Sequence, residues 1–200
     1  MNQPYDQRYT AYPTDRSRFR KYVRRAYLKS AAAMVTGPTI DFGCGIGELL
    51  QRLPTGSLGL EVNQATVQHC TAIGLEVMHY DANVQGWDLA GVPSSLRMRS
   101  LVISHVLEHL EDPVGKFRKL LAGCEERGIT TVLVIVPGVK GYATDPTHLT
   151  FLDRSDLHAP EVVHGTGFRI DRSEYFPVDS EWFGKYFTHN ELRVRFVLAP

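Results

Sequence analysis

Hydrophobic residues in this chain fall into short apolar runs, separated by segments with the periodicity of amphipathic helices. The apolar runs predict strands over residues 39–42, 57–62, 76–81, 100–104 and 130–137. Helices are predicted to begin after Asn63 and after Asp112, two residue types that cap helix N-termini, and Pro113 occupies a first helical position. Phe117, Leu120 and Leu121 give the second of these helices an apolar stripe. Alternating strands and helices predict an α/β fold with a largely parallel sheet.

The two ends of the chain have different patterns. Leu192, Val194, Phe196 and Leu198 alternate with Arg193 and Arg195, which predicts a final strand with one exposed face. Residues 1–13 are polar, and a helix is predicted from Thr14 or Asp15, with Phe19, Tyr22, Val23 and Ala26 facing the body. The pattern divides the chain into a lid-like N-terminal arm and helix (1–35) and a main domain (36–200).

Arg16, Arg20 and Arg24 form a row along one face of this predicted helix. Such a row is typical of a solvated helix face, but it can also form a patch for an anionic substrate or a phosphate.

The segment Thr39–Leu50 predicts a strand, a glycine-rich turn and the start of a helix at Glu48. Gly43, Gly45 and Gly47 permit a tight turn and a close approach of the backbone to a ligand. Dinucleotide-binding turns have the spacing G-x-G-x-x-G, whereas this turn has G-x-G-x-G and an acid, Asp41, two residues before it. A carboxylate there would repel a pyrophosphate and favour a cationic amino group.

Acidic residues also end the next two predicted strands. Glu61 lies about 20 residues after Asp41, where nucleotide-binding α/β folds place an acid that accepts hydrogen bonds from ribose hydroxyls. Asp81 ends the following strand and precedes Ala82, although an Asp before a loop is common in any case.

These residues resemble those of the class I S-adenosylmethionine-dependent methyltransferases. Asp41 and the three glycines match motif I, (D/E)-x-G-x-G-x-G, and the segment His105–Pro113 is close to the "VLEHL-x-D-P" segment of the type 11/23 small-molecule branch. Weaker similarities are Asp81 to motif III, His148–Phe151 to a "His-x-x-x-Phe" segment with one residue fewer, and Gly167-Phe168 to the start of a sixth strand. The resemblance implies a Rossmann-like seven-stranded sheet in the order 3-2-1-4-5-7-6, with strand seven antiparallel and helices on both faces.

The resemblance also implies S-adenosylmethionine as the cofactor and a role for each matching residue. Asp41 and the turn, with Gly43, Cys44, Gly45 and Gly47, would bind its amino-acid end, Glu61 the ribose, and Asp81 with Ala82 the adenine. His105 follows strand four, where the methyl group would point, so it is expected to contact the cofactor and to act as a base. His148, in the loop after strand five, is the second candidate base, because imidazole titrates near neutrality.

The residues His105, Glu108, His109 and His148 also supply nitrogen and oxygen donors of metal-binding type. A related pattern with Glu in the first place holds a divalent metal in the small-RNA 2′-O-methyltransferases. His stands in that place here, and many proteins with "VLEHL" bind no metal. We therefore expect no metal, and we expect Glu108 and His109 to fix the loop after strand four.

Composition limits the partners. The 200 residues contain 22 Lys and Arg and 22 Asp and Glu, so the net charge is zero and no global field attracts nucleic acid. The three cysteines form no C-x-x-C pair, and no apolar run reaches the roughly 20 residues of a membrane span. A cytoplasmic enzyme that methylates an oxygen or nitrogen of a small molecule or glycan is expected; the acceptor's identity and the oligomeric state do not follow from the sequence. The alternatives are a non-catalytic partner protein, similar to the methionine-biosynthesis protein W group, and a metal-dependent RNA 2′-O-methyltransferase.

Overall fold

The structure is a computed structural model that describes residues 18–199, with side chains from residue 24 onward. The predicted arm over 1–13, the helix start at Thr14 or Asp15, and Arg16 lie outside the described residues. So do the side chains of Phe19, Arg20, Tyr22 and Val23.

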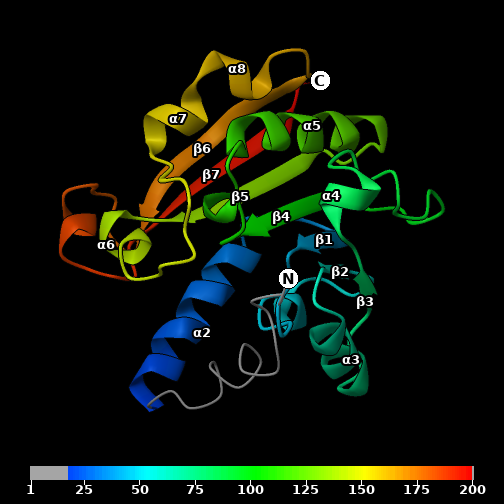
Figure 1. Cartoon of the computed structure of the whole chain (residues 1–200), viewed down its shortest axis with the longest axis horizontal. Coiled ribbons are helices and arrows are strands. Elements are labelled where there is room, and N and C mark those ends of the chain that lie inside the picture. Colours follow the sequence, from blue (N-terminus) through cyan, green and yellow to red (C-terminus); the bar gives the residue numbers. More distant parts are fainter. Residues whose placement is uncertain (1–17, 200) are drawn as a thin grey trace.

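Seven strands form one mixed sheet (Figure 1). The strands are β1 (Thr39–Phe42), β2 (Leu58–Glu61), β3 (Val77–His79), β4 (Ser100–Ser104), β5 (Thr131–Pro137), β6 (Phe168–Phe176) and β7 (Glu191–Leu198). Their order is β3-β2-β1-β4-β5-β7-β6, and β7 is antiparallel to both β5 and β6. The other neighbouring strands are parallel. The predicted strand order and the antiparallel seventh strand are therefore confirmed.

Helices connect the strands on both faces of the sheet. The α-helices are α2 (Arg18–Ala32), α3 (Gln64–Ala72), α4 (Ala82–Gln85), α5 (Pro113–Glu126), α6 (Val139–Tyr142), α7 (Arg154–His158) and α8 (Pro160–Val163). Short 3₁₀ turns lie at η2 (Leu50–Arg52), η3 (Leu107–His109) and η4 (Phe183–Lys185). The predicted caps are confirmed, because the Asn63 side chain accepts hydrogen bonds from Ala65 and Thr66, and Asp112 accepts one from Gly115.

Each face of the sheet has its own hydrophobic core. Figure 1 shows α2 and α3 on one side and α5, α7 and α8 on the other. Alternate residues of the central strands point to opposite faces. Val102, Leu133 and Ile135 pack with α2, whereas Leu101, Ile103, Val132, Val134 and Val136 pack with α5. The sheet is therefore buried on both sides at β4 and β5, which explains their continuous apolar sequence.

The face that α2 buries differs from the predicted one. Tyr27, Leu28 and Ala31 are 3–6% exposed, whereas Ala26 is exposed. The prediction for Ala26 was wrong because the stripe that meets the sheet is set by contacts with β4, β5 and β7.

The helix predicted to begin at Glu48 is a single 3₁₀ turn, η2. Leu53 is extended, with φ −74° and ψ 158°, and the next residue is Pro54. Proline disfavours the α conformation in the residue before it and cannot donate the next helical hydrogen bond. The glycine turn is therefore followed by a short, abruptly ended turn instead of a regular helix.

The prediction that one face of the last strand is exposed was also wrong. Arg193 is 0% exposed, because α2 covers this face of β7. Its guanidinium hydrogen-bonds Ser30 Oγ and Tyr27 O, pairs with Glu191 at 3.3 Å, and lies 4.0 Å from the centroid of the Phe176 ring. An arginine that pairs with a buried carboxylate can itself be buried, so alternation with apolar residues does not by itself indicate solvent exposure.

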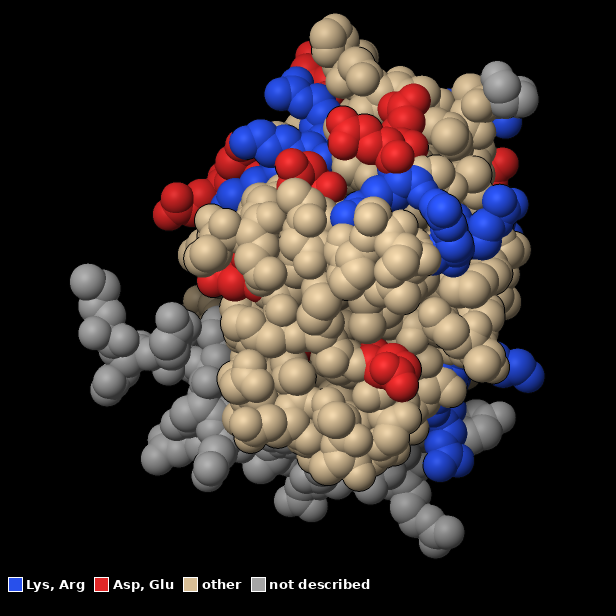
Figure 2. Space-filling view, turned by 90° about the vertical axis from the view of Figure 1, so that its right-hand side faces the viewer, with Lys and Arg blue, Asp and Glu red and all other residues tan. Residues whose placement is uncertain are grey.

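On the face that forms the right-hand side of Figure 1, basic and acidic side chains are interspersed around a broad uncharged area (Figure 2). Among residues 18–199, no helix has the length and apolar character needed to cross a bilayer.

Candidate functional site

The candidate site lies at the carboxyl ends of β1, β2 and β4, where the strand order changes direction. The turn after β1 is held against β2, since the N–H groups of Gly43 and Cys44 both donate to Leu60 O, at 2.8 and 3.0 Å. Crevices at such switch points are the usual ligand sites of open α/β sheets.

The three predicted glycines have left-handed backbones, with φ of +74° at Gly43, +51° at Gly45 and +76° at Gly47. A Cβ on Gly43 would lie 2.5 Å from Val106, and one on Gly47 would lie 2.3 Å from Leu75, so these two serve packing. A Cβ on Gly45 would meet no atom within 4 Å among the described residues. The open side of the turn is therefore at Gly45.

Asp41 lies on β1, two residues before this turn, and is 2% exposed. Its Oδ2 atom is buried and has no hydrogen-bond partner among the described residues. Burial, with a contribution from the Glu61 charge, raises the pKa of Asp41 to about 7, although a hydrogen bond from the Leu50 backbone and the charge of Arg24 act in the opposite direction. A buried carboxylate without a partner is unstable by itself, and a cationic donor would relieve it.

Glu61, predicted as the ribose ligand, already holds the turn in place. Its Oε2 accepts a hydrogen bond from Gly45 N–H at 2.9 Å, and its Oε1 accepts one from Asn63 N–H at 2.8 Å. Each carboxylate oxygen has two lone pairs, so both oxygens retain the capacity for a further hydrogen bond.

Asp81, Ala82 and Cys44 lie around the same edge of the sheet. Asp81 follows β3 and caps α4, accepting a hydrogen bond from Asn83 N–H at 2.9 Å, and Ala82 is 9% exposed. Cys44 is 8% exposed, and burial raises the pKa of its thiol, so it takes part in the turn as an unreactive residue.

Arg24 of α2 is a site residue that sequence reasoning left on a solvated face or in an anion-binding patch. Its Nε lies 3.2 Å from Glu48 Oε2, so α2 is connected to the segment that follows the glycine turn. Its charge also affects Asp41 and Glu191. The arginine spacing in the sequence indicated a charged face on this helix, but it did not show which arginine contacts the segment after the glycine turn.

His105 ends β4 in a left-handed conformation, with φ +56°, and its N–H donates to Ile135 O at 2.9 Å. The ring lies between two carboxylates: Nδ1 is 3.2 Å from Glu108 Oε1, and Nε2 is 3.2 Å from Glu191 Oε1. Burial lowers the pKa of His105, but the two carboxylates outweigh it and raise the pKa to about 9. Sequence reasoning missed Glu191, because it comes from β7, 86 residues away.

His148 lies close to the same group. Its Nε2 is 3.9 Å from both Glu108 Oε1 and Asp145 Oδ2, and its ring packs 4.8 Å from the ring of His109, between centroids. The structure therefore brings His105, His148, Glu108 and His109 together, whereas Asp81 lies at the other end of the crevice, after β3.

Comparisons with known proteins show the family and the fold of the chain. The family model described as methionine biosynthesis protein MetW matches residues 25–130, which include the glycine turn and the His105–Pro113 segment. None of the curated proteins matches the chain.

Solved structures with the same fold include a SAM-dependent methyltransferase from Archaeoglobus fulgidus, at 19% identity and a TM-score of 0.67, covering 88% of this chain and 94% of that one. A putative methyltransferase from Haloferax volcanii, solved in complex with the Trm112 methyltransferase activator, has 14% identity and a TM-score of 0.65 over 99% and 100% of the two chains. The magnesium protoporphyrin IX methyltransferase of Synechocystis PCC 6803 with bound SAH has 13% identity and a TM-score of 0.61. The match covers 92% of this chain and 89% of that one. At these identities, the similarity establishes the fold.

Proposed function

This chain belongs to the methionine biosynthesis protein MetW family and has the fold of SAM-dependent methyltransferases, and from that premise we propose that it binds S-adenosylmethionine at the turn after β1. We further propose that it transfers the methyl group to an oxygen or nitrogen of a small molecule or glycan.

The observation that carries the proposal is the state of Asp41. Its Oδ2 is buried without a hydrogen-bond partner among the described residues, two residues before a glycine turn whose open side is at Gly45. The ammonium group of the cofactor's amino-acid end is a donor of the type that this carboxylate lacks. A dinucleotide pyrophosphate in the same place would be repelled by Asp41 and Glu61.

The remaining cofactor residues follow from position. Glu61 would bind the ribose hydroxyls with its remaining lone pairs, while it continues to fix Gly45. Asp81 and Ala82, at the end of β3, would border the adenine. The proposed residues therefore offer a contact for the amino-acid end, the ribose and the adenine of this cofactor.

Bound S-adenosylmethionine supplies an electrophilic methyl group, so the chain has to position an acceptor and to manage its proton. We assign the proton-handling role first to His105, because its ring is oriented by Glu108 and Glu191 at the carboxyl end of β4. Although burial lowers the pKa of His105, these carboxylates raise it to about 9, so only its minor neutral form accepts a proton near pH 7, and the rate of methyl transfer should rise with pH up to about 9. His148 is the second candidate.

The family match supports one further candidate function. A protein of the MetW family can act through a partner enzyme and need not catalyse methyl transfer itself. In that case the cofactor site would be retained, but methyl transfer would be absent.

Calorimetry with S-adenosylmethionine tests the cofactor site. Asp41→Asn and Glu61→Gln should each weaken binding by roughly 10- to 150-fold, the equivalent of a charge-assisted hydrogen bond of about 1.5–3 kcal/mol. Glu161→Gln, at an exposed position on α8, is the matched control and should bind normally. Undiminished affinity in both site variants would refute the assignment.

Transfer of a radiolabelled methyl group from the cofactor to the small-molecule fraction of a cell extract separates the two functions. An enzyme should label an acceptor, and His105→Asn should reduce that labelling. A protein that binds the cofactor normally but labels nothing, alone or with the extract's proteins present, would support the partner function.

A further inference from the structure

We propose that Glu108, His109 and His148 form a binding site for a divalent first-row transition ion at the carboxyl end of β4. The inference goes beyond the proposed function and does not depend on it, since it concerns an ion and not the methyl donor.

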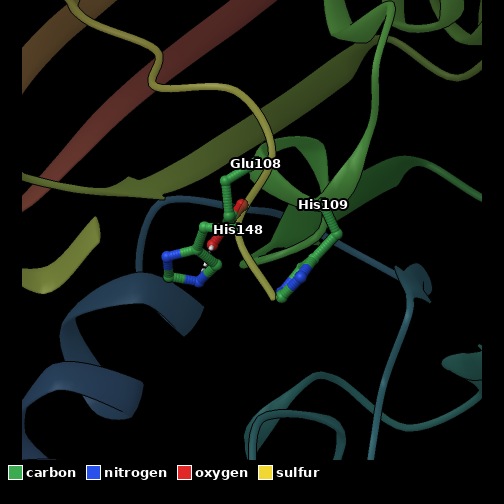
Figure 3. A group of neighbouring side chains, drawn as sticks. All are labelled: Glu108, His109 and His148. Carbon is green, nitrogen blue, oxygen red and sulfur yellow. Dashed lines mark ion pairs between the residues drawn. The ribbon is translucent and has the colours of Figure 1, made fainter. Parts of the chain in front are cut away.

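The three side chains converge from two segments that are distant in the sequence. Glu108 and His109 belong to η3, and His148 lies in the loop that follows α6. One ligand atom from each residue lies within 4.8 Å of the others. Figure 3 shows the Glu108 carboxylate directed toward His148, with the His109 ring beside them.

Glu108 is the strongest indication of a ligand. It is 0% exposed, and neither of its carboxylate oxygens has a hydrogen-bond partner among residues 18–199. The ring of His105, 3.2 Å away, offers a charge contact to Oε1, but no described residue offers such a contact to Oε2. Leaving a buried carboxylate oxygen unpaired is costly, and coordination of a cation would relieve that cost.

Both imidazoles are oriented as metal ligands usually are. His148 Nδ1 lies 2.8 Å from Tyr142 O, and His109 Nδ1 lies 3.2 Å from Thr147 O. A carbonyl oxygen can only accept, so each Nδ1 carries the proton and each Nε2 keeps its lone pair. Hydrogen bonding of the second ring nitrogen to a backbone carbonyl is the common outer-shell arrangement of a ligating histidine.

Main-chain hydrogen bonds hold the two segments in register. The N–H groups of Leu149 and Thr150 both donate to Glu108 O, at 2.8 and 3.0 Å, and Thr150 Oγ1 donates to Leu110 O at 2.6 Å. The Tyr142 ring also stacks on His148, with centroids 5.3 Å apart. The positions of the donors are therefore set by the fold before any ion binds.

Two imidazoles and one carboxylate favour a transition ion, because Mg²⁺ and Ca²⁺ prefer sites made of oxygen donors only. Tetrahedral Zn²⁺, with ligand distances of about 2.1 Å, needs donor atoms about 3.4 Å apart, so the three side chains would have to move slightly closer together. Three protein ligands leave at least one coordination position for water or for an oxygen of another ligand. A bound ion would occupy His148 Nε2, which would remove His148 as a candidate base.

Titration of the chelator-treated, dialysed protein with Co²⁺ tests the site without any measurement of activity. Binding should be saturable at one ion per chain, with visible absorption bands of a low-coordinate Co²⁺–imidazole complex, and Zn²⁺ should displace the Co²⁺. His109→Asn should weaken Co²⁺ binding by at least about 100-fold, more than the 10- to 100-fold expected for loss of an outer-shell partner. His109 is only partly buried, so its variant tests the site even where Glu108→Gln fails to fold.

His69→Asn is the matched control, because His69 is exposed on α3 and lies away from the cluster. It should bind Co²⁺ as the wild type does. The proposal would be overturned by Co²⁺ affinity that His109→Asn and His148→Asn leave unchanged, or by affinity that His69→Asn reduces equally. Saturable binding of Mg²⁺ in preference to Co²⁺ would also overturn it, because the donor set would then be wrong.

Discussion

Replacing Asp41 by Asn should make the protein more stable at high pH, by an amount that grows with pH. The pKa of Asp41 is raised from 3.8 to about 7 in the folded chain, chiefly by burial. Between those two values the folded state binds more protons than the unfolded state, so the free energy of unfolding falls as the pH rises. The loss of unfolding free energy begins near pH 4 and is complete above about pH 7.

The size of the effect follows from the shift. One pKa unit corresponds to 1.36 kcal/mol, so a shift of about three units costs about 4 kcal/mol when fully developed, of which about 2.5 kcal/mol develops between pH 5 and pH 8. Asn cannot ionise, so its variant should lack this part of the pH dependence. The groups whose charges act with Asp41 are Glu61, Arg24, Cys44 and Cys70, and all of them are present in both proteins.

Urea unfolding at pH 5, 6, 7 and 8 and constant ionic strength measures the difference. The stability of Asp41→Asn relative to wild type should rise by about 2.5 kcal/mol across this range. Constant contributions, such as the buried amide of Asn, cancel in the comparison between pH values. A difference that stays flat from pH 5 to pH 8 would refute the reasoning, and Glu161→Gln should show such a flat difference.

Three further predictions concern other positions. Arg193→Met should cost about 1–3 kcal/mol in urea unfolding, because it removes one of the two cationic partners of the buried Glu191 carboxylate and leaves only His105. Arg195→Met, at a 31% exposed ion pair, should cost less than about 1 kcal/mol, and equal losses would contradict the burial argument. Gly47→Ala should destabilise the chain more than Gly74→Ala. Both glycines have positive φ, but only the Cβ of Ala at position 47 would clash, at 2.3 Å from Leu75. A lower thermal unfolding temperature for Gly74→Ala than for Gly47→Ala would disprove this. His105→Asn should reduce single-turnover methyl transfer by roughly 10²–10⁴ while cofactor affinity stays nearly intact, and near-wild-type rates across pH 5.5–8.5 would remove this histidine from the mechanism.

Much of the architecture was predictable because it rests on local patterns. Apolar runs located the strands, and Asn63 and Asp112 marked helix starts, since a side-chain cap satisfies nearby backbone groups and needs no tertiary information. The glycine turn was predictable for the same reason, as φ values of +51° to +76° are strained for other residues.

The errors concern contacts between distant segments. Because Arg193 alternates with apolar residues, the sequence predicted that it lies on the surface. Its burial depends on contacts with α2, more than 160 residues earlier in the chain. The helix expected after the glycine turn fails because Pro54 lies too near, a local signal that outweighed the family pattern.

The candidate site was predicted as a set of residues but not as a set of contacts. Sequence spacing placed His105 and His148 after neighbouring strands, but it could not show that Glu191 lies beside the first or that Glu108 faces both. Those relations depend on the register between β4, β5 and β7, which no short segment of the sequence encodes.

The contacts between α2 and β7 also have a consequence for the order in which the chain can fold. Tyr27 Oη donates to His189 O, and Arg193 reaches back to Ser30 and the Tyr27 carbonyl. During synthesis on the ribosome, Ser30 of α2 emerges 163 residues before Arg193 of the strand that anchors it. The polar contacts that fix α2 to β7 therefore cannot form until β7 has left the exit tunnel, whereas the apolar residues of α2 can meet β4 and β5 earlier.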